Sequence, residues 1–127
     1  MSAALRRSRS EDPTDLDDWR RSLRARHRDY GTIWVVKLSG EADLATRALL
    51  RRELAAAVRM DRDLVVLDVA GLRFCDVGCA ELILAAGRRT SVSLAAAKGA
   101  VKRVFELLDP HETVPRYRAI QGTTLTR

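Results

Sequence analysis

The apolar run LVVLDV at Leu64–Val69 constrains the fold of this chain more than any other feature. A continuous run of this length is typical of a central strand that is covered on both faces, as in a parallel sheet. Further strands are predicted over Ile33–Leu38 and Val92–Ala96, and segments with helical periodicity alternate with them. Helices that alternate with buried strands predict one α/β domain with a mostly parallel sheet.

The helical segments are predicted over Leu44–Met60, Gly78–Arg89 and Gly99–Leu108. In the first, Leu50, Leu54, Ala57 and Val58 recur at the spacing of one helix face, which predicts that they point inward. In the second, the predicted inward residues are Ala80, Ile83, Leu84 and Gly87.

The amino-terminal part is predicted to form a β-hairpin. Alternation over Ser22–Arg28 places Leu23, Ala25 and His27 on one side, and Gly31 supplies the turn before Ile33–Leu38. Gly40 is expected to end that second strand. Val114–Ile120 predicts an edge strand, so we expect a mixed sheet of four or five strands with three or more helices.

Chain length and composition predict a single domain with a disordered extension. A chain of 127 residues is long enough for one core, and residues 1–18 are polar and without periodicity. We therefore expect a disordered segment over 1–18, a domain over 19–120 and a flexible tail over 121–127.

The net charge of +6 and the sequence pI of about 10.1 raise the possibility of a nucleic-acid partner. Basic residues are nevertheless spread along the chain among 17 acidic ones, and aromatic residues make up only 5%, so we predict no nucleic-acid binding. No apolar run approaches the ~18–20 residues that span a bilayer, and the start resembles no signal peptide. These features predict a soluble, cytoplasmic protein that does not associate with membranes.

The stretch RFCDVGC at Arg73–Cys79 is the best candidate for a chemical site. Its Cys-x3-Cys spacing differs from that of a zinc knuckle, and both His27 and His111 lie far away in sequence, so we predict no metal. Cys79 begins a helix and is expected to be more accessible than Cys75, but the Asp76 carboxylate would oppose a thiolate there. Since no phosphate-binding glycine loop is present either, we predict neither enzymatic activity nor a cofactor.

Two loops remain, SGEAD and RFCDVGC, and each brings an Asp to the start of a helix. Asp43 and Asp76 are predicted to cap these helices by accepting hydrogen bonds from free backbone amides. Because both loops follow strands of a parallel sheet, they should share the edge formed by the carboxyl ends of the strands, where such folds usually carry their working surface.

The segment from Ile33 to Leu108 resembles a STAS domain, the sulfate-transporter and anti-sigma-factor-antagonist family. The resemblance rests on a strand–Gly-Glu-x-Asp–helix motif and on a strand–Asp-x-x-Gly-x-x-Phe-x-Asp motif. The matching residues are Gly40, Glu41, Asp43, Asp68, Gly71, Phe74 and Asp76. Family members that are switched by phosphorylation continue from the last Asp with Ser-Ser-Gly or a close variant, and the second position accepts the phosphoryl group. Here these positions are Val77, Gly78 and Cys79, so the phosphorylatable position carries no hydroxyl.

The resemblance implies a small non-enzymatic bacterial regulator, similar to an anti-sigma factor antagonist, that binds a kinase-like anti-sigma factor without being phosphorylated at Gly78. The implied partner-binding residues are Glu41, Asp43, Asp76, Val77, Gly78, Cys79 and Leu82. Two alternatives stay open: a STAS-like small subunit of a transport or sensory signalling assembly, and simple drift in a connecting loop. Cys79, Leu82 and Ala86 form an apolar strip that is either buried in the monomer or exposed for docking. The oligomeric state does not follow from the sequence pattern.

Overall fold

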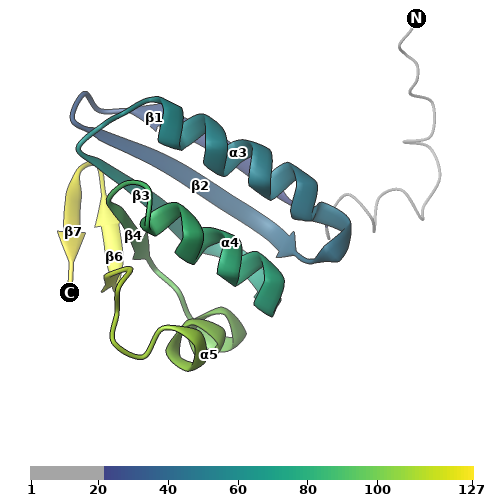
Figure 1. Ribbon diagram of the computed structural model, residues 1–127. Coiled ribbons are helices and arrows are strands. Elements are labelled where there is room, and N and C mark those ends of the chain that lie inside the picture. The colour runs from purple at the N-terminus through teal and green to yellow at the C-terminus, as the bar shows by residue number, and fades with distance from the viewer. Residues whose placement is uncertain (1–21) are drawn as a thin grey trace, which may run out of the picture.

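The computed structural model describes residues 22–127, so the predicted extension over 1–18 and the predicted domain start at residue 19 lie outside the described residues. The described part contains a five-stranded sheet in the order β1-β2-β3-β4-β5 (Figure 1). The strands are β1 (Arg24–Asp29), β2 (Ile33–Ala42), β3 (Leu64–Cys75), β4 (Val92–Ala95) and β5 (Arg116–Tyr117). Only β1 runs antiparallel to its neighbour; the other pairs are parallel. The mixed sheet and the amino-terminal hairpin are thereby confirmed.

The hairpin is held by local and cross-element hydrogen bonds. Asp29 Oδ1 accepts the backbone N–H of Gly31 at 2.8 Å, and Gly31 has a φ of 85°, which glycine adopts without strain. Trp34 Nε1 donates to His27 Nδ1 at 2.8 Å, so the other ring nitrogen, Nε2, carries the proton toward Glu53 Oε1 at 2.7 Å. His27 therefore lies on the helix side of the sheet, as its alternation predicted.

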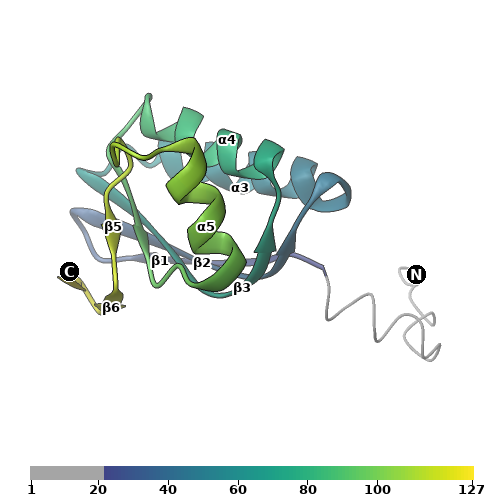
Figure 2. The same cartoon turned by 90° about the horizontal axis from the view of Figure 1, so that it is seen from below.

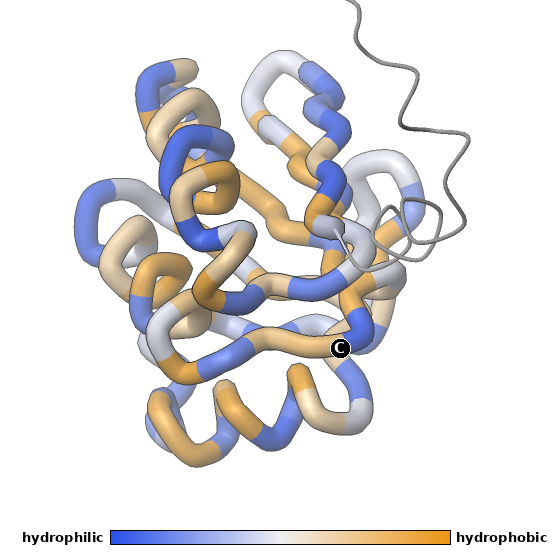
Figure 3. The backbone as a smooth tube through the Cα atoms, turned by 90° about the vertical axis from the view of Figure 1, so that its right-hand side faces the viewer, coloured by the Kyte–Doolittle hydropathy of each residue, from blue (hydrophilic) through white to orange (hydrophobic). Residues whose placement is uncertain are grey.

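Three helices of the described chain cover one face of the sheet (Figure 2). They are α3 (Arg47–Arg59), α4 (Val77–Gly87) and α5 (Gly99–Leu108), and a short 3-10 turn, η2 (Leu44–Thr46), precedes α3. Hydrophobic and hydrophilic segments are distributed over the whole backbone (Figure 3), and α4 is the most apolar of the three helices. The apolar side chains of the helices pack onto the sheet in one large core, whose fully buried members include Phe105, Leu38, Leu50, Leu67 and Ile83.

The other face of the sheet carries a smaller apolar cluster. Val35, Val66 and Ala95 are buried there beneath a carboxyl-terminal hairpin formed by β6 (Ala119–Gln121) and β7 (Thr124–Thr126). The predicted edge strand over Val114–Ile120 is thus divided: two residues join the sheet as β5, and the chain then turns into this hairpin. The tail expected over 121–127 contributes β7, and its flexibility stays a prediction.

Strands β2 and β3 are longer than predicted. The strand that begins at Ile33 was expected to end at Gly40, and the apolar run that predicted the next strand ends at Val69. The two strands continue side by side to Ala42 and Cys75. The register of the pairing shifts near Ser39 and Gly40, but the strands stay paired beyond these shifts. Gly40 has a φ of 99°, and a Cβ there would collide with the carbonyl oxygen of Ser22, so only glycine permits this passage.

The inward face of α4 differs in part from the prediction. Its buried residues are Cys79, Ala80, Ile83 and Ala86, whereas Leu84 and Gly87 are half-buried. Because nearly every position of α4 is apolar, periodicity alone could not define the face that meets the core. On α3 the prediction was closer, since Leu50, Leu54 and Ala57 are buried.

Candidate functional site

The two acid-bearing loops meet at the carboxyl edge of the sheet, as predicted. Asp43 caps η2: its Oδ1 accepts the N–H of Thr46 at 3.2 Å, and Thr46 Oγ1 accepts the N–H of Asp43 at 3.0 Å. Asp76 caps α4, because its Oδ1 accepts the N–H of Cys79 at 2.8 Å. The loops are also joined directly, since the N–H of Asp76 donates to the carbonyl of Ala42 at 2.9 Å.

Arg47, which the sequence analysis did not single out, connects the two loops by its side chain. Its Nη2 donates to Asp76 Oδ2 at 3.1 Å, and both side chains are about one quarter to one third exposed. Burial alone would raise the pKa of Asp76, but the Cys79 N–H and thiol together with Arg47 hold this pKa below its ordinary value. Asp76 is therefore a carboxylate at neutral pH.

Gly78, which the sequence resemblance aligns with a phosphoryl-accepting position, lies against this guanidinium. A Cβ built on Gly78 would lie 2.5 Å from Arg47 Cζ, well inside van der Waals contact. Any larger residue at position 78 would have to displace the Arg47 head group. The absence of a side chain at position 78 and the placement of Arg47 are therefore coupled.

Both thiols are buried. Cys75 is 4% exposed and Cys79 is fully buried, with its Sγ donating to the carbonyl of Asp43 at 3.5 Å. Burial raises the pKa of Cys75 to about 12 and that of Cys79 to about 11. The prediction that Cys79 would be accessible is wrong, because the loop that carries Asp43 covers the first turn of α4. Cys79 can support the edge from inside but offers no surface to a partner.

The exposed apolar side chains of this edge were not identified from the sequence as a surface. Leu44 is 75% exposed, Val77 is 52% exposed and Phe74 is 42% exposed. Phe74 pairs in register with Glu41 on the neighbouring strand, and Leu44 and Val77 each follow a capping Asp. A usable sequence signal was available: the first residue after an N-cap often points outward, so an apolar residue there is a candidate for contact.

We define the carboxyl-edge surface as Glu41, Asp43, Leu44, Phe74, Asp76 and Val77. Val77 is exposed, and Glu41, Asp43, Asp76, Gly78 and Leu82 are half-buried. Leu82 packs against the main core, and its neighbours Cys79 and Ala86 belong to that core, so the apolar strip on α4 is largely internal. The edge therefore presents three apolar side chains beside three carboxylates.

Residues 22–127 contain no group of three or more His, Cys, Asp or Glu residues placed to hold a metal ion. Among the same residues, no helix has the length and apolar character needed to cross a membrane.

The fold and this edge define a small α/β domain. Three of the five large apolar side chains that are exposed among the described residues lie at the edge where the parallel strands end. A family model described as "Mlab, STAS domain" matches residues 30–115. The chain belongs to the STAS domain family.

Solved structures agree with this assignment at the level of the fold. An anti-sigma factor antagonist from Mycobacterium paratuberculosis superimposes with a TM-score of 0.70 at 24% identity, over 77% of this chain and 87% of that one. The anti-sigma factor antagonist SpoIIAA in its unphosphorylated form gives a TM-score of 0.62 at 17% identity, over 75% and 89% of the two chains. The Bacillus cell fate determinant SpoIIAA in its phosphorylated form gives 0.57 at 16% identity, over 75% and 92%. Among curated proteins no relative matches the chain.

Proposed function

We propose that this protein is a cytoplasmic, non-enzymatic bacterial regulator that binds a kinase-like anti-sigma factor through the carboxyl-edge surface. The observation that carries the proposal is the exposed trio of Leu44, Phe74 and Val77 on an edge rich in carboxylates. Exposed apolar side chains with a charged rim are typical of protein-binding surfaces. Two of the solved proteins with this fold are anti-sigma factor antagonists, which favours a partner of the same kind.

The partner surface that would complement this edge is basic and partly apolar. Arg47 balances the charge of Asp76, but within residues 22–127 Glu41 and Asp43 form no ion pair, so their carboxylates offer negative charge. Leu44 and Val77 offer apolar area. Each Å² of apolar surface that is buried on binding contributes about 25 cal/mol to the affinity. The carboxylates determine the orientation of the partner. Binding would be reversible, because the surface is small.

In this proposal, phosphorylation at position 78 does not control the binding of the partner. Gly78 has no hydroxyl, and the Arg47 guanidinium occupies the space beside it. A kinase-like partner could then bind this edge but could not release itself by phosphorylating it. Control would come from expression, from competition or from another modification.

The test uses purified protein and a purified anti-sigma factor of the same organism, already bound to its sigma factor. We expect the protein to bind the anti-sigma factor and to release the sigma factor in size-exclusion chromatography. In parallel, incubation with ATP followed by mass spectrometry should show no phosphate on the peptide that contains Gly78. Absence of binding, or phosphate transfer to this loop, would contradict the proposal.

A second candidate is a small subunit of a transport or sensory signalling assembly, as noted from the sequence. It would use the same edge but would remain in a stable, stoichiometric complex. Affinity purification at physiological expression distinguishes the two: a fixed ratio to membrane or receptor components favours the assembly, and exchange with a free sigma factor favours the antagonist.

A further inference from the structure

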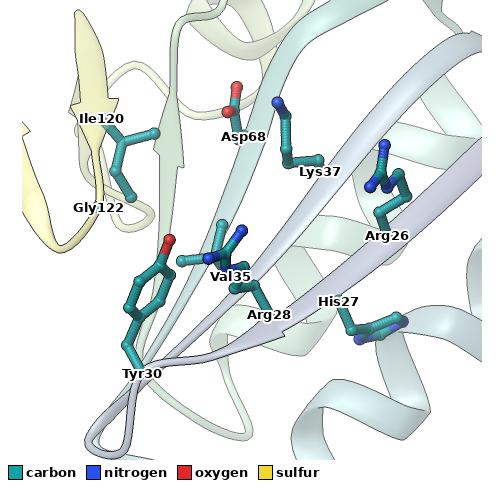
Figure 4. Close-up of a pocket in the computed structure, with 9 residues that line it drawn as sticks. All are labelled: Arg26, His27, Arg28, Tyr30, Val35, Lys37, Asp68, Ile120 and Gly122. Carbon is teal, nitrogen blue, oxygen red and sulfur yellow. The ribbon is translucent and has the colours of Figure 1, made fainter.

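The sheet face that lies opposite the helices carries a group of cations. Alternation along β1 puts Arg26 and Arg28 on this face, and both are exposed. Arg26 pairs in register with Lys37 of β2, which pairs in turn with Asp68 of β3. We call Arg26, Arg28 and Lys37 the basic face. Figure 4 shows these three side chains projecting around one hollow.

The hollow has a volume of about 260 Å³ and lies between the basic face and the β6–β7 hairpin. Tyr30, Ile120 and Gly122 form its other margin. Asp68 supplies a single carboxylate against three cations, and its Oδ1 already accepts the N–H of Ala70 at 3.1 Å. The hollow therefore has a positive balance of charge and is open to solvent.

The arrangement leaves positive charge without compensation inside the described part of the chain. Arg26 and Lys37 stand directly opposite each other on antiparallel strands, where like charges destabilise a sheet. Within residues 22–127 neither side chain forms an ion pair, and Arg28 contacts the ring of Tyr30, with Cζ 5.6 Å from its centroid. An anionic group placed over this face would relieve the repulsion.

The sequence contains an anionic segment within reach. The stretch EDPTDLDD at Glu11–Asp18 has five carboxylates and no basic residue, and five residues join it to β1. The structure places the last two of these residues, Ser22 and Leu23, and Leu23 is buried in the core. At about 3.3–3.6 Å per residue, the four steps from Ser22 back to Asp18 span about 13–14 Å, which matches the roughly 13 Å from Ser22 to Arg26. The described chain begins beside Gly40, which lies three residues along β2 from Lys37.

We propose that Glu11–Asp18 is an intramolecular ligand of the basic face and binds across Arg26, Arg28 and Lys37. The tether keeps the segment at an effective concentration on the order of millimolar, so weak, exposed ion pairs are sufficient for occupancy. The segment neutralises a surface that would otherwise attract polyanions, and an acidic partner would have to displace it. This proposal is independent of the function proposed for the carboxyl edge.

The test exploits the chain's three lysines, Lys37, Lys98 and Lys102. A carbodiimide joins a carboxylate to a nearby amine as an amide, with the water that is lost taken up by the reagent, and peptides are then mapped by mass spectrometry. Lys37 lies on the basic face, whereas Lys98 and Lys102 lie at the exposed start of α5 and serve as internal controls. We expect links from Glu11–Asp18 to Lys37 to exceed those to the control lysines by roughly tenfold at low salt. They should fall toward the control level near 1 M salt, where the Debye length is about 3 Å.

Three variants sharpen the test. Arg26→Gln combined with Arg28→Gln keeps Lys37 as the reporter and should reduce its links several-fold. Arg51→Gln combined with Arg59→Gln removes the same charge from exposed positions of α3 and should leave the links unchanged. Asp68→Asn removes the one carboxylate that neighbours Lys37 within the sheet, which excludes a competing internal link.

Three outcomes would overturn the proposal. Links distributed evenly over the three lysines would show that the segment has no preferred site. Links to Lys37 that join two isotopically distinct copies and vanish on dilution would show that a second copy is the occupant. Links to Lys37 that survive both the Arg26/Arg28 variant and high salt would show that the basic face does not hold the segment.

Discussion

Arg47 and Asp76, which are 29 residues apart in sequence, form an ion pair of 3.1 Å, and the Arg47 guanidinium covers Gly78. The pair joins the start of α3 to the cap of α4. It also fills the space that a side chain at position 78 would need. Its stability and the identity of residue 78 should therefore be linked.

The first prediction concerns this coupling. Gly78→Ala should gain up to about 1 kcal/mol from helix propensity when Arg47 is replaced by Ala, because the space beside residue 78 is then free. With Arg47 present, the same change must displace the guanidinium, and most of the gain should be lost. A double-mutant cycle by urea unfolding should give a coupling of about 0.5–1 kcal/mol. Additive effects would show that Arg47 does not constrain position 78.

The second prediction separates the two roles of Asp76. Asp76→Ala removes the cap of α4 and the ion pair, and should cost about 1–2 kcal/mol of unfolding free energy. Asp76→Asn keeps a capping oxygen and loses only the charge, so it should cost less, about 0.2–1 kcal/mol. Equal losses in chemical denaturation would mean that capping contributes nothing measurable.

The third prediction concerns the carboxyl-edge surface. Leu44→Asp should weaken binding of the anti-sigma factor by at least roughly tenfold, because it places a charge where apolar contact is proposed. Leu107→Asp is the matched control: Leu107 is 80% exposed on α5, and its substitution should change neither folding nor binding. Isothermal titration with both variants, each shown by circular dichroism to be folded, measures the difference. Equal affinities would remove Leu44 from the site.

The fourth prediction concerns stability in acid. Asp109 is 5% exposed and accepts hydrogen bonds from Val114 N–H at 3.0 Å, Thr113 N–H at 3.0 Å and Arg116 Nη1 at 2.7 Å. Burial opposes its charge, but these bonds outweigh burial and lower its pKa from 3.8 to about 2. Its contribution, on the order of 2 kcal/mol, is present above the ordinary pKa near 4 and is lost as the pH falls toward 2. In the Asp109→Asn variant, the free energy of unfolding should depend less on pH over this window. If the pH dependence is unchanged, other groups cause the loss of stability in acid.

The fifth prediction concerns the thiols. With the pKa of Cys75 at about 12 and that of Cys79 at about 11, both thiols should be almost fully protonated near pH 8. Labelling by an aromatic disulfide reagent should be at least ~100-fold slower in the native state than in urea, for both cysteines alike. Fast native labelling of Cys79 would show that the first turn of α4 opens readily.

The sequence by itself determined the three helices, the strands β1 to β4 and the edge at which the chemistry-bearing loops meet. Local hydrophobic periodicity decides these properties, and parallel strands necessarily bring their carboxyl ends to one edge. For the same reason Asp43 and Asp76 could be placed as helix caps, because capping depends on residues only three positions apart. The STAS resemblance, carried by the spacing of these loops, agrees with the family model that matches residues 30–115.

Only the tertiary structure decided how far β2 and β3 continue, which face of α4 is buried and what lies beside Gly78. Each of these depends on register between segments that are distant in sequence. The pairing of Ala42 with Cys75 places Asp43 above the first turn of α4, and this placement buries Cys79. The same register brings Arg47 to Asp76 and leaves Leu44 and Val77 exposed at the edge. Periodicity reports a residue's local face, whereas its burial depends on what a distant segment packs against that face.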